Sequence, residues 1–224
     1  MLHDKAVKIL TSLGELVFSS RCVACGILGL HLCEKCSNEM KPSHIKTIFP
    51  SNSGFSLIVI SATSYSPIAS SILLASKESH ITSADSVIRE LLGHSLSFFL
   101  DKYEADFLLP IPSRPSMNRK RGRSYISEIA ASVGNQHCLP TISLLRHGRI
   151  VRDQSSLARS GRRNNLDGAL VVEDRDRVAE NSRALLIDDL VTTGATLLEA
   201  ARALRYAGIE VSGGVTAFVA KPLR

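Results

Sequence analysis

The segment LLIDDLVTTGATLLEA, residues 185–200, constrains the fold more than any other part of the sequence. Its first three residues are apolar and predict a buried strand, and the apolar spacing from Ala195 onward predicts a helix. A strand, a short loop and a helix in direct succession are typical of α/β proteins, whose ligands bind beyond the carboxyl ends of parallel strands. We therefore expect Asp188 and Asp189 to emerge at a ligand-binding edge.

The loop between this strand and this helix has the chemistry of a phosphate site. At a helix N-terminus, free backbone N–H groups and the positive end of the helix dipole accept an anion. Gly194 allows a tight turn, and the hydroxyls of Thr192, Thr193 and Thr196 can add donors. Two carboxylates beside a phosphate would repel it unless they bound another part of the same ligand. Paired acceptors suit the vicinal hydroxyls of a ribose, so the predicted ligand contains a ribose 5-phosphate unit.

Strand-like and helix-like segments alternate along the rest of the chain. This alternation predicts an α/β fold with a mostly parallel sheet and helices on both faces. The segment 37–55 is rich in Ser, Pro and Lys and is expected to be a linker. Strands are expected near residues 57–65, 106–112, 141–145, 168–172, 183–188 and 211–220, and helices near residues 67–77, 84–102, 124–133 and 195–207.

Four of the five cysteines lie within fifteen residues, in the pattern C-x2-C-x7-C-x2-C. Two C-x-x-C turns can place four thiolates around one tetrahedral zinc ion, and such a closed site organises the chain without catalysing a reaction. The alternatives are a disulfide pair or a redox couple, which a cytosolic protein disfavours. His31 lies between the pairs and could replace one cysteine. The predicted zinc ligands are Cys22, Cys25, Cys33 and Cys36.

The first residues of the chain have apolar side chains at helical spacing with charges between them, which predicts a short amphipathic helix. They lack the uninterrupted apolar core of a signal peptide, and the chain has no run of about 18 apolar residues. We expect a cytoplasmic protein without membrane insertion. Two domains are expected, residues 1–45 with the amphipathic helix and the zinc finger, and residues 55–224 with the α/β fold.

The positive charge of the chain is concentrated in one region. The formal net charge is +6, but residues 114–163 hold eleven Arg or Lys against two acidic residues, a net charge of +9, and the remainder carries −3. This concentration indicates an anion site more than a generally basic surface. The same arginines could instead line a groove for single-stranded DNA. Such grooves usually add stacking aromatic residues, and only Tyr125 lies in this stretch.

The stretch DDLVTTGAT, residues 188–196, closely resembles the phosphoribosyl pyrophosphate (PRPP) binding signature of type I phosphoribosyltransferases. The resemblance implies a phosphoribosyltransferase-like fold for the larger domain. It also implies that Asp188 and Asp189 contact the ribose hydroxyls, and that the following loop, which includes Ala195, holds the 5′-phosphate. The motifs GxxxxGK[ST] and GxGxxG, which a P-loop NTPase or a dinucleotide-binding fold would need, are absent.

Nearly the full chain is similar to the ComF family, which is associated with DNA uptake during natural competence and joins a zinc finger to a phosphoribosyltransferase-like domain. The family's elements occur in order: a four-cysteine module, a tyrosine and a lysine (Tyr65 and Lys77), LLPIP before an arginine-rich stretch, a Q-x2-L-x4-R-x2-N element, and DDLVTTGAT. The fourth element consists of Gln154, Leu157, Arg162 and Asn165. One stretch departs from the family, because residues 121–125 read RGRSY where RGFNQ is usual.

The resemblance implies transfer of a phosphoribosyl group from PRPP to an acceptor with release of pyrophosphate, usually with Mg²⁺. Cations then stabilise the negative charge on the departing pyrophosphate. Ser113 is implied as a PRPP contact in a pyrophosphate loop, and residues 146–163 resemble a flexible hood that excludes water. The residues implied in catalysis are Asp188, Asp189, Arg114 and Lys77. The residues implied in hood and pyrophosphate contacts are Arg121, Arg152, Gln154 and Arg162.

Two questions stay open in the sequence. Lys77 could reach an anionic ligand, or it could simply be favourable at a helix C-terminus. The chain could be a PRPP-dependent transferase, or it could be a non-enzymatic adaptor that senses PRPP or handles single-stranded DNA beside a competence helicase. The intact aspartate pair favours PRPP binding in both classes, and no motif identifies an acceptor.

Overall fold

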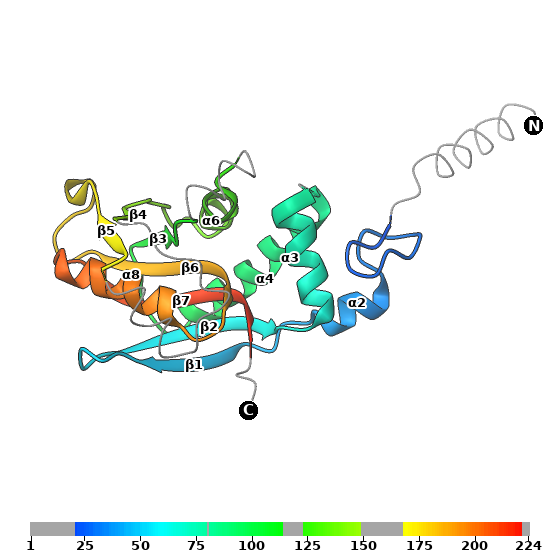
Figure 1. The fold of residues 1–224 in the computed structure, drawn as a ribbon, viewed down its shortest axis with the longest axis horizontal. Helices are drawn as coiled ribbons and strands as arrows, with labels where there is room; N and C mark the ends of the chain where they lie inside the picture. Colours follow the sequence, from blue (N-terminus) through cyan, green and yellow to red (C-terminus); the bar gives the residue numbers. More distant parts are fainter. Residues whose placement is uncertain (1–20, 80, 114–122, 149–167, 221–224) are drawn as a thin grey trace, which may run out of the picture.

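The computed structural model of the chain describes residues 21–79, 81–113, 123–148 and 168–220 (Figure 1). The strands of its main sheet are β1 (Ile45–Pro50), β2 (Ser56–Ser64), β3 (Phe107–Pro110), β6 (Arg183–Val191) and β7 (Glu210–Val219). They lie in the order β1-β2-β7-β6-β3. β1 is antiparallel to β2, and all other neighbours are parallel. The prediction of a mostly parallel sheet is confirmed.

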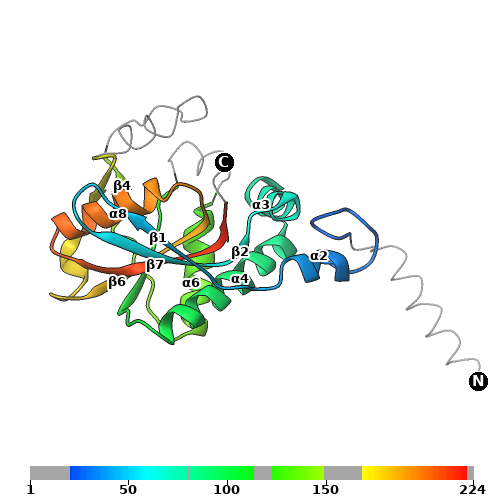
Figure 2. The same cartoon turned by 90° about the horizontal axis from the view of Figure 1, so that it is seen from below.

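Helices cover both faces of this sheet. They are α3 (Pro67–Ser79), α4 (Thr82–Leu100), α6 (Tyr125–Gln136) and α8 (Ala195–Tyr206), with the 3-10 turn η1 (Arg175–Arg177) before β6. On one face α4 packs on β2 and β7, α6 packs on β3 and β6, and α3 packs against α4; α8 packs on β6 and β7 from the other face (Figures 1 and 2). The predicted arrangement of helices on both faces is therefore confirmed.

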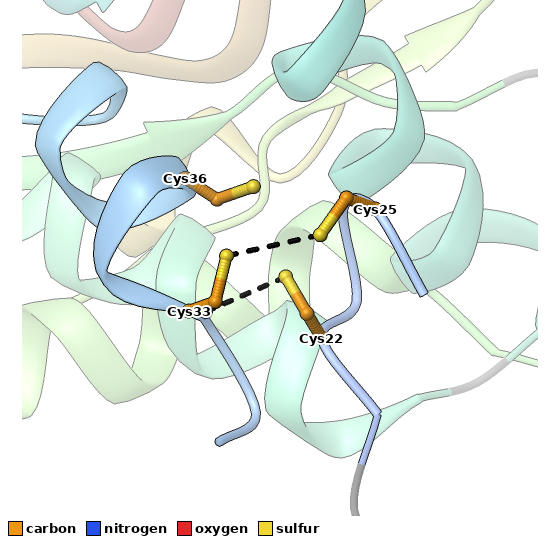
Figure 3. Close-up of side chains that lie close together, drawn as sticks. All are labelled: Cys22, Cys25, Cys33 and Cys36. Atoms are coloured by element: carbon orange, nitrogen blue, oxygen red, sulfur yellow. Dashed lines mark hydrogen bonds between the residues drawn. The ribbon is translucent and has the colours of Figure 1, made fainter. Parts of the chain in front are cut away.

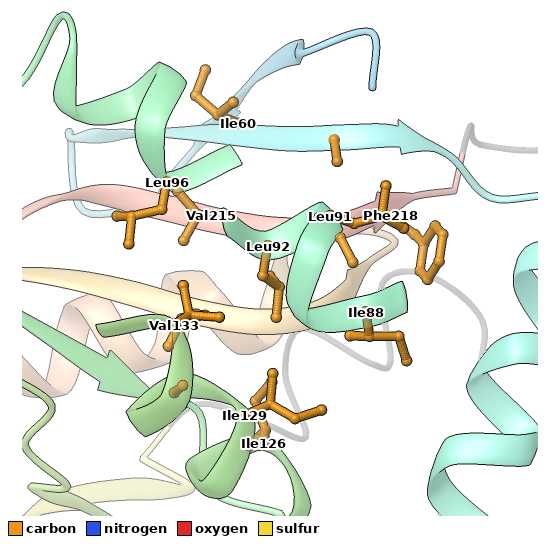
Figure 4. Close-up of a cluster of buried hydrophobic side chains, with 14 of the residues drawn as sticks. Ile60, Ile88, Leu91, Leu92, Leu96, Ile126, Ile129, Val133, Val215 and Phe218 are labelled. Carbon is orange, nitrogen blue, oxygen red and sulfur yellow. The ribbon is translucent and has the colours of Figure 1, made fainter. Parts of the chain in front are cut away.

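Successive residues of the strands contribute to two separate cores. In β6, Leu185 and Ile187 pack in the core of α4 and α6, whereas Ala184 and Leu186 pack in the core of α8. All four are fully buried, as expected for a strand between two helical layers. Figure 4 shows the first core, where apolar side chains of α4 such as Leu92 face α6 and the sheet. Each fully buried Leu or Ile stabilises the fold by about 1.5–3 kcal/mol.

Local capping explains where α3 begins. Pro67 occupies the first helical position, where a missing N–H group costs nothing. The preceding Ser66 accepts a hydrogen bond from the backbone N–H of Ala69 at 3.2 Å, which caps the first turn. α3 therefore starts directly after β2 and carries Lys77 in its last turn.

Two short strands form a second, smaller sheet; the predicted strand 168–172 contains one of them, and the predicted strand 141–145 overlaps the other only at Leu145. β4 (Leu145–His147) and β5 (Leu170–Val172) pair antiparallel with each other and do not join the main sheet. Thr141, which lies in the predicted strand 141–145, makes only a single parallel bridge to Leu108 of β3. The second sheet lies at the two ends of the basic segment 149–167, which falls outside the described residues.

The prediction of a linker over residues 37–55 is wrong, because this segment contains β1. Its composition is that of an edge strand. Lys46 and Pro50 are exposed, and such residues protect a free strand edge from pairing with another chain. Phe49 points inward and packs in the core of α8. The same Ser, Pro and Lys content that is typical of a linker therefore belongs here to a paired strand.

The four-cysteine segment lies at one end of the molecule, beside α3 (Figures 1 and 2). It includes the short helix α2 (Glu34–Glu39). Val23, Ala24 and Leu32 are half-buried and pack against the core of α4 and α6, so apolar contacts attach this segment to the α/β domain. Within the described ranges, no helix is both long enough and apolar enough to cross a membrane.

Candidate functional site

The acidic pair lies at the carboxyl end of the sheet, but inside a strand. β6 continues to Val191, three residues beyond the predicted end at residue 188, so Asp188 and Asp189 both belong to its last four residues. The strand is longer because Leu190 and Val191 also pair in register, with Phe218 and Val219 of β7. Asp189 is buried, with 4% of its surface exposed. The loop 192–194 and α8 follow, as expected for a ligand site of a parallel sheet.

Lys77 makes an ion pair with Asp189. Its Nζ lies 2.6 Å from Asp189 Oδ2, and the two side chains are 26% and 6% exposed. The contact joins the carboxyl end of α3 to the carboxyl end of β6. The structure thus brings Lys77 to the acidic pair, and its contact with an anionic ligand stays a prediction.

Asp188 holds its proton more tightly than an ordinary aspartate. Burial, and next the neighbouring Asp189 carboxylate, raise the pKa of Asp188 to about 7, against the opposing charge of Lys77. The backbone N–H of Asp189 donates to Asp188 Oδ1 at 2.9 Å, which favours the ionised form. Asp188 therefore titrates near neutral pH in the absence of a ligand.

We expect the free energy of unfolding to contain a contribution from Asp188 that falls as the pH rises from about 4 to about 7. The unfolded chain loses this proton near the ordinary pKa of 3.8, whereas the folded chain keeps it up to about pH 7. The folded state thus binds more protons in this window and is less stable at its upper end. Denaturant unfolding of the wild type and of Asp188→Asn at about pH 4.5 and about pH 7.5 isolates the contribution. A pH-independent difference between the two proteins would contradict it.

The loop before α8 packs closely against β1. Gly194 adopts φ of 73°, and a Cβ at this position would collide with the ring of Phe49 from β1. Only glycine fits both constraints. Thr192 and Thr196 are exposed at the N-terminus of α8, so their hydroxyls are accessible. Thr193 is half-buried, and its Oγ1 accepts a hydrogen bond from the N–H of Ala195 at 3.4 Å.

The other parallel strands end at the same edge of the sheet. Tyr65 follows β2, is 40% exposed, and donates its N–H to the carbonyl oxygen of Val219 at 2.8 Å. Ser113 follows β3 and is half-buried. His147 of β4 has its Nε2 3.1 Å from the carbonyl oxygen of Pro112, which places the end of β4 beside the loop that contains Ser113. His147 belongs to the predicted hood, but no sequence pattern linked it to the loop after β3.

Several predicted site residues lie outside the described residues, so their roles stay predictions. They are Arg114, Arg121, Arg152, Gln154 and Arg162.

A second group of charged residues adjoins the acidic pair and was also missed. Arg123 makes an ion pair with Asp85, 2.7 Å from Nη1 to Oδ2, and Tyr125 lies against both Arg123 and Lys77. Burial raises the pKa of Asp85, but hydrogen bonds from Arg123 and Ser76 outweigh it and hold this pKa below its usual value. The only sequence signal was the RGRSY stretch, which departs from the family pattern.

The four predicted zinc ligands converge on one point (Figure 3). Their sulfur atoms all lie within 4.8 Å of one another. The Sγ atoms of Cys25 and Cys33 are 3.7 Å apart, which is far longer than a disulfide bond of about 2.05 Å. A tetrahedral zinc ion with Zn–S bonds of about 2.3 Å would separate its sulfur ligands by about 3.8 Å. The cysteines therefore fit a zinc ion, and His31 is exposed and outside the group.

No protein-family model matches the chain, and no curated protein sequence matches it. Among solved structures it is similar to an adenine phosphoribosyltransferase, with a TM-score of 0.43 and 10% identity, covering 82% of this chain and 89% of that one. For adenine phosphoribosyltransferase from Saccharomyces cerevisiae the TM-score is 0.41 and the identity 8%, covering 84% and 89%. For orotate phosphoribosyltransferase from Aeropyrum pernix they are 0.40 and 15%, covering 82% and 78%. These values are low, so what this chain binds has to be argued from its own residues.

Proposed function

We propose that this chain binds PRPP and transfers its phosphoribosyl group to an acceptor with release of pyrophosphate. The observation that supports the proposal most directly is the juxtaposition of the DDLVTTGAT motif with the carboxyl edge of a parallel sheet. Two carboxylates, at Asp188 and Asp189, immediately precede an accessible helix N-terminus. A ribose with a 5′-phosphate offers its hydroxyls to the two carboxylates and its phosphate to the helix N-terminus.

In this mechanism the motif orients the sugar. The carboxylates of Asp188 and Asp189 accept hydrogen bonds from the ribose hydroxyls. The N-terminus of α8, with the hydroxyls of Thr192 and Thr196, holds the 5′-phosphate. The bond from C1 of the sugar to pyrophosphate breaks, its electron pair leaves with pyrophosphate, and the acceptor forms a new bond to C1. With water as the acceptor the products would be ribose 5-phosphate and pyrophosphate.

Positive groups around the site stabilise the leaving pyrophosphate in this proposal. Lys77 is already at the acidic pair, and Ser113 begins the loop that leads to the predicted contact Arg114. Mg²⁺ prefers oxygen ligands, and the carboxylates of Asp188 and Asp189 together with oxygens of PRPP would hold it. When bound, Mg²⁺ would neutralise charge on the pyrophosphate. Arg152 and Arg162 of the predicted hood, residues 146–163, would then add further positive charge.

The other parts of the proposal concern the cellular role. The order of motifs resembles the ComF family, so we propose a cytoplasmic protein that acts in DNA uptake during natural competence, with a competence helicase as its partner. The four cysteines would hold a structural zinc ion, since four thiolates leave no open coordination position.

The test is a calorimetric titration of the zinc-loaded protein with PRPP and Mg²⁺, followed by measurement of pyrophosphate release in the same sample. We expect saturable binding and release of pyrophosphate over time. Binding without release would instead support the non-enzymatic alternative, a PRPP sensor. The absence of binding would contradict the proposal.

The second candidate is a single-stranded-DNA adaptor, and the observation that favours it is the net charge of +9 in residues 114–163. Cations in such a groove bind phosphates without sequence preference, and their affinity falls steeply as salt rises. This candidate is tested by titrating the protein with a single-stranded oligonucleotide at two salt concentrations. The titration is then repeated in the presence of PRPP, which is expected to compete only if both ligands share the site.

A further inference from the structure

We propose that Arg123 is a positioning residue, which holds Lys77 at the acidic pair by fixing the carboxyl end of α3. The geometry of this inference stands by itself, and its consequence for PRPP rests on the proposed function. Arg123 lies two residues before α6, in the RGRSY stretch that departs from the family pattern.

The guanidinium of Arg123 joins two helices. Nη1 and Nη2 donate to the two carboxylate oxygens of Asp85 in α4, at 2.7 and 3.0 Å. Nη2 also donates to the carbonyl oxygen of Ser76 in α3 at 2.7 Å. Ser76 is among the last four residues of α3, whose carbonyl groups lack partners within the helix. Because Ser76 directly precedes Lys77, this contact fixes the backbone from which the Lys77 side chain extends.

Asp85 completes the tether from the other side. Its carboxylate is 11% exposed and also accepts a hydrogen bond from the hydroxyl of Ser76. The same carboxylate therefore binds both the Arg123 guanidinium and the last turn of α3. Glu128 also lies 3.5 Å from Arg123, but its side chain is 51% exposed, so water weakens that contact.

Tyr125 provides a common surface for the two cations. Its ring centroid lies 5.7 Å from Lys77 Nζ and 5.2 Å from Arg123 Cζ, both within reach of a cation–π interaction. Tyr125 is 1% exposed, so its ring has little room to move. Burial raises its pKa well above the ordinary value, and the ring stays neutral beside the acids. Three contacts thus restrain Lys77. Its side chain lies on the Tyr125 ring and pairs with Asp189, and its backbone follows Ser76, whose carbonyl group is bound by Arg123.

A lysine could not replace the planar guanidinium of Arg123. A planar guanidinium reaches the Asp85 carboxylate and the Ser76 carbonyl at the same time, whereas an ammonium is a single point charge on a flexible stem. Arg123→Lys therefore keeps the charge and loses the tether. Without it, the last turn of α3 and the long side chain of Lys77 would regain conformational freedom.

The first test needs no PRPP. Lysine side chains of the wild type and of Arg123→Lys are acetylated with a limiting amine-reactive ester, and the rate at Lys77 is measured by peptide mass spectrometry against the exposed Lys102. The ion pair with the buried Asp189 shields Lys77 in the wild type. We expect the rate at Lys77 to rise about fivefold in Arg123→Lys. Asp85→Asn, which removes the anchor and leaves Arg123, is expected to raise it similarly.

The second test uses PRPP and a double-mutant cycle. Arg123→Lys is expected to weaken PRPP binding about fivefold when Lys77 is present, and to have no effect in the Lys77→Met background. Arg183→Lys is the matched control, because Arg183 makes a comparable contact with Asp106 at the opposite end of β6. It should change neither the rate at Lys77 nor the affinity.

The outcomes separate the inference from the proposed function. An unchanged rate at Lys77, with a lowered unfolding midpoint, would make Arg123 a plain structural contact and overturn the inference. Equal losses of affinity with and without Lys77 would overturn it too. A changed rate at Lys77 in a protein that does not bind PRPP at all would support the positioning role and contradict the proposed function.

Discussion

Changing Asp188 and Asp189 together to Asn is expected to abolish PRPP binding and to leave the fold intact. A hydrogen bond to a charged group contributes about 1.5–3 kcal/mol. The loss of two such bonds corresponds to a weakening of more than about 100-fold. Asn keeps the shape of the side chain but replaces one acceptor oxygen by a donor, which faces a ribose hydroxyl less favourably.

The fold should survive this change for two reasons. Asp188 is half-buried beside another carboxylate, and Asn relieves that repulsion. Lys77 loses its partner, but its side chain is 26% exposed and can turn to water. The affinity is measured by calorimetry with PRPP and Mg²⁺, and the fold by circular dichroism. Asp176→Asn, at an exposed aspartate of η1, is the matched control. Undiminished affinity in the double variant would refute the ribose assignment.

The strand, loop and helix around the acidic pair could be predicted because their signals are local. Apolar residues, acids, threonines and a glycine follow one another within residues 185–200. The end of β6 was the exception, since the strand continues through Asp189 to Val191 by pairing Leu190 and Val191 with Phe218 and Val219 of β7. That pairing joins residues far apart in the chain, and acidic residues are poor strand formers by themselves.

The contacts around Lys77 could not be predicted from the sequence. Its partner Asp189 is distant in the chain, and so are Asp85 and Arg123 from each other. Such tertiary ion pairs leave no periodic pattern, and the sequence showed only a lysine at a helix end and an unusual RGRSY stretch. The structure shows that the side chains of Lys77 and Arg123 both lie against the ring of Tyr125.

The four-cysteine cluster was predictable for the opposite reason. Two C-x-x-C turns each hold a pair of thiols close together, and only the meeting of the two pairs depends on the fold. The structure shows that meeting in Figure 3. It also shows a connection that the sequence did not suggest, because Val23, Ala24 and Leu32 pack against the same core as α3 and α4. Loss of the metal would therefore expose part of that core.

Removal of zinc is expected to unfold the four-cysteine segment and to lower the stability of the whole chain. Structural zinc sites in small peptides contribute about 10–16 kcal/mol of apparent binding energy, and those peptides are unfolded without metal. The apolar loop residues Ile27, Leu28 and Leu30 of this segment are largely exposed, so they add little packing that could replace the metal. Treatment with a strong chelator should therefore release one zinc ion per chain, lower the thermal midpoint and promote aggregation.

The substitution Cys22→Ser tests the zinc site by removing a single ligand. Cys22 is 2% exposed and accepts a hydrogen bond from the N–H of Cys33 at 3.4 Å, so serine would leave three thiolates and a buried hydroxyl. We expect this variant to lose the zinc equivalent, measured by atomic emission, and much of its solubility. Cys138→Ser, at an exposed cysteine outside the cluster, should keep both. A wild-type protein that is well folded and free of metal would refute the zinc site, because four free thiols would then suffice to hold the segment.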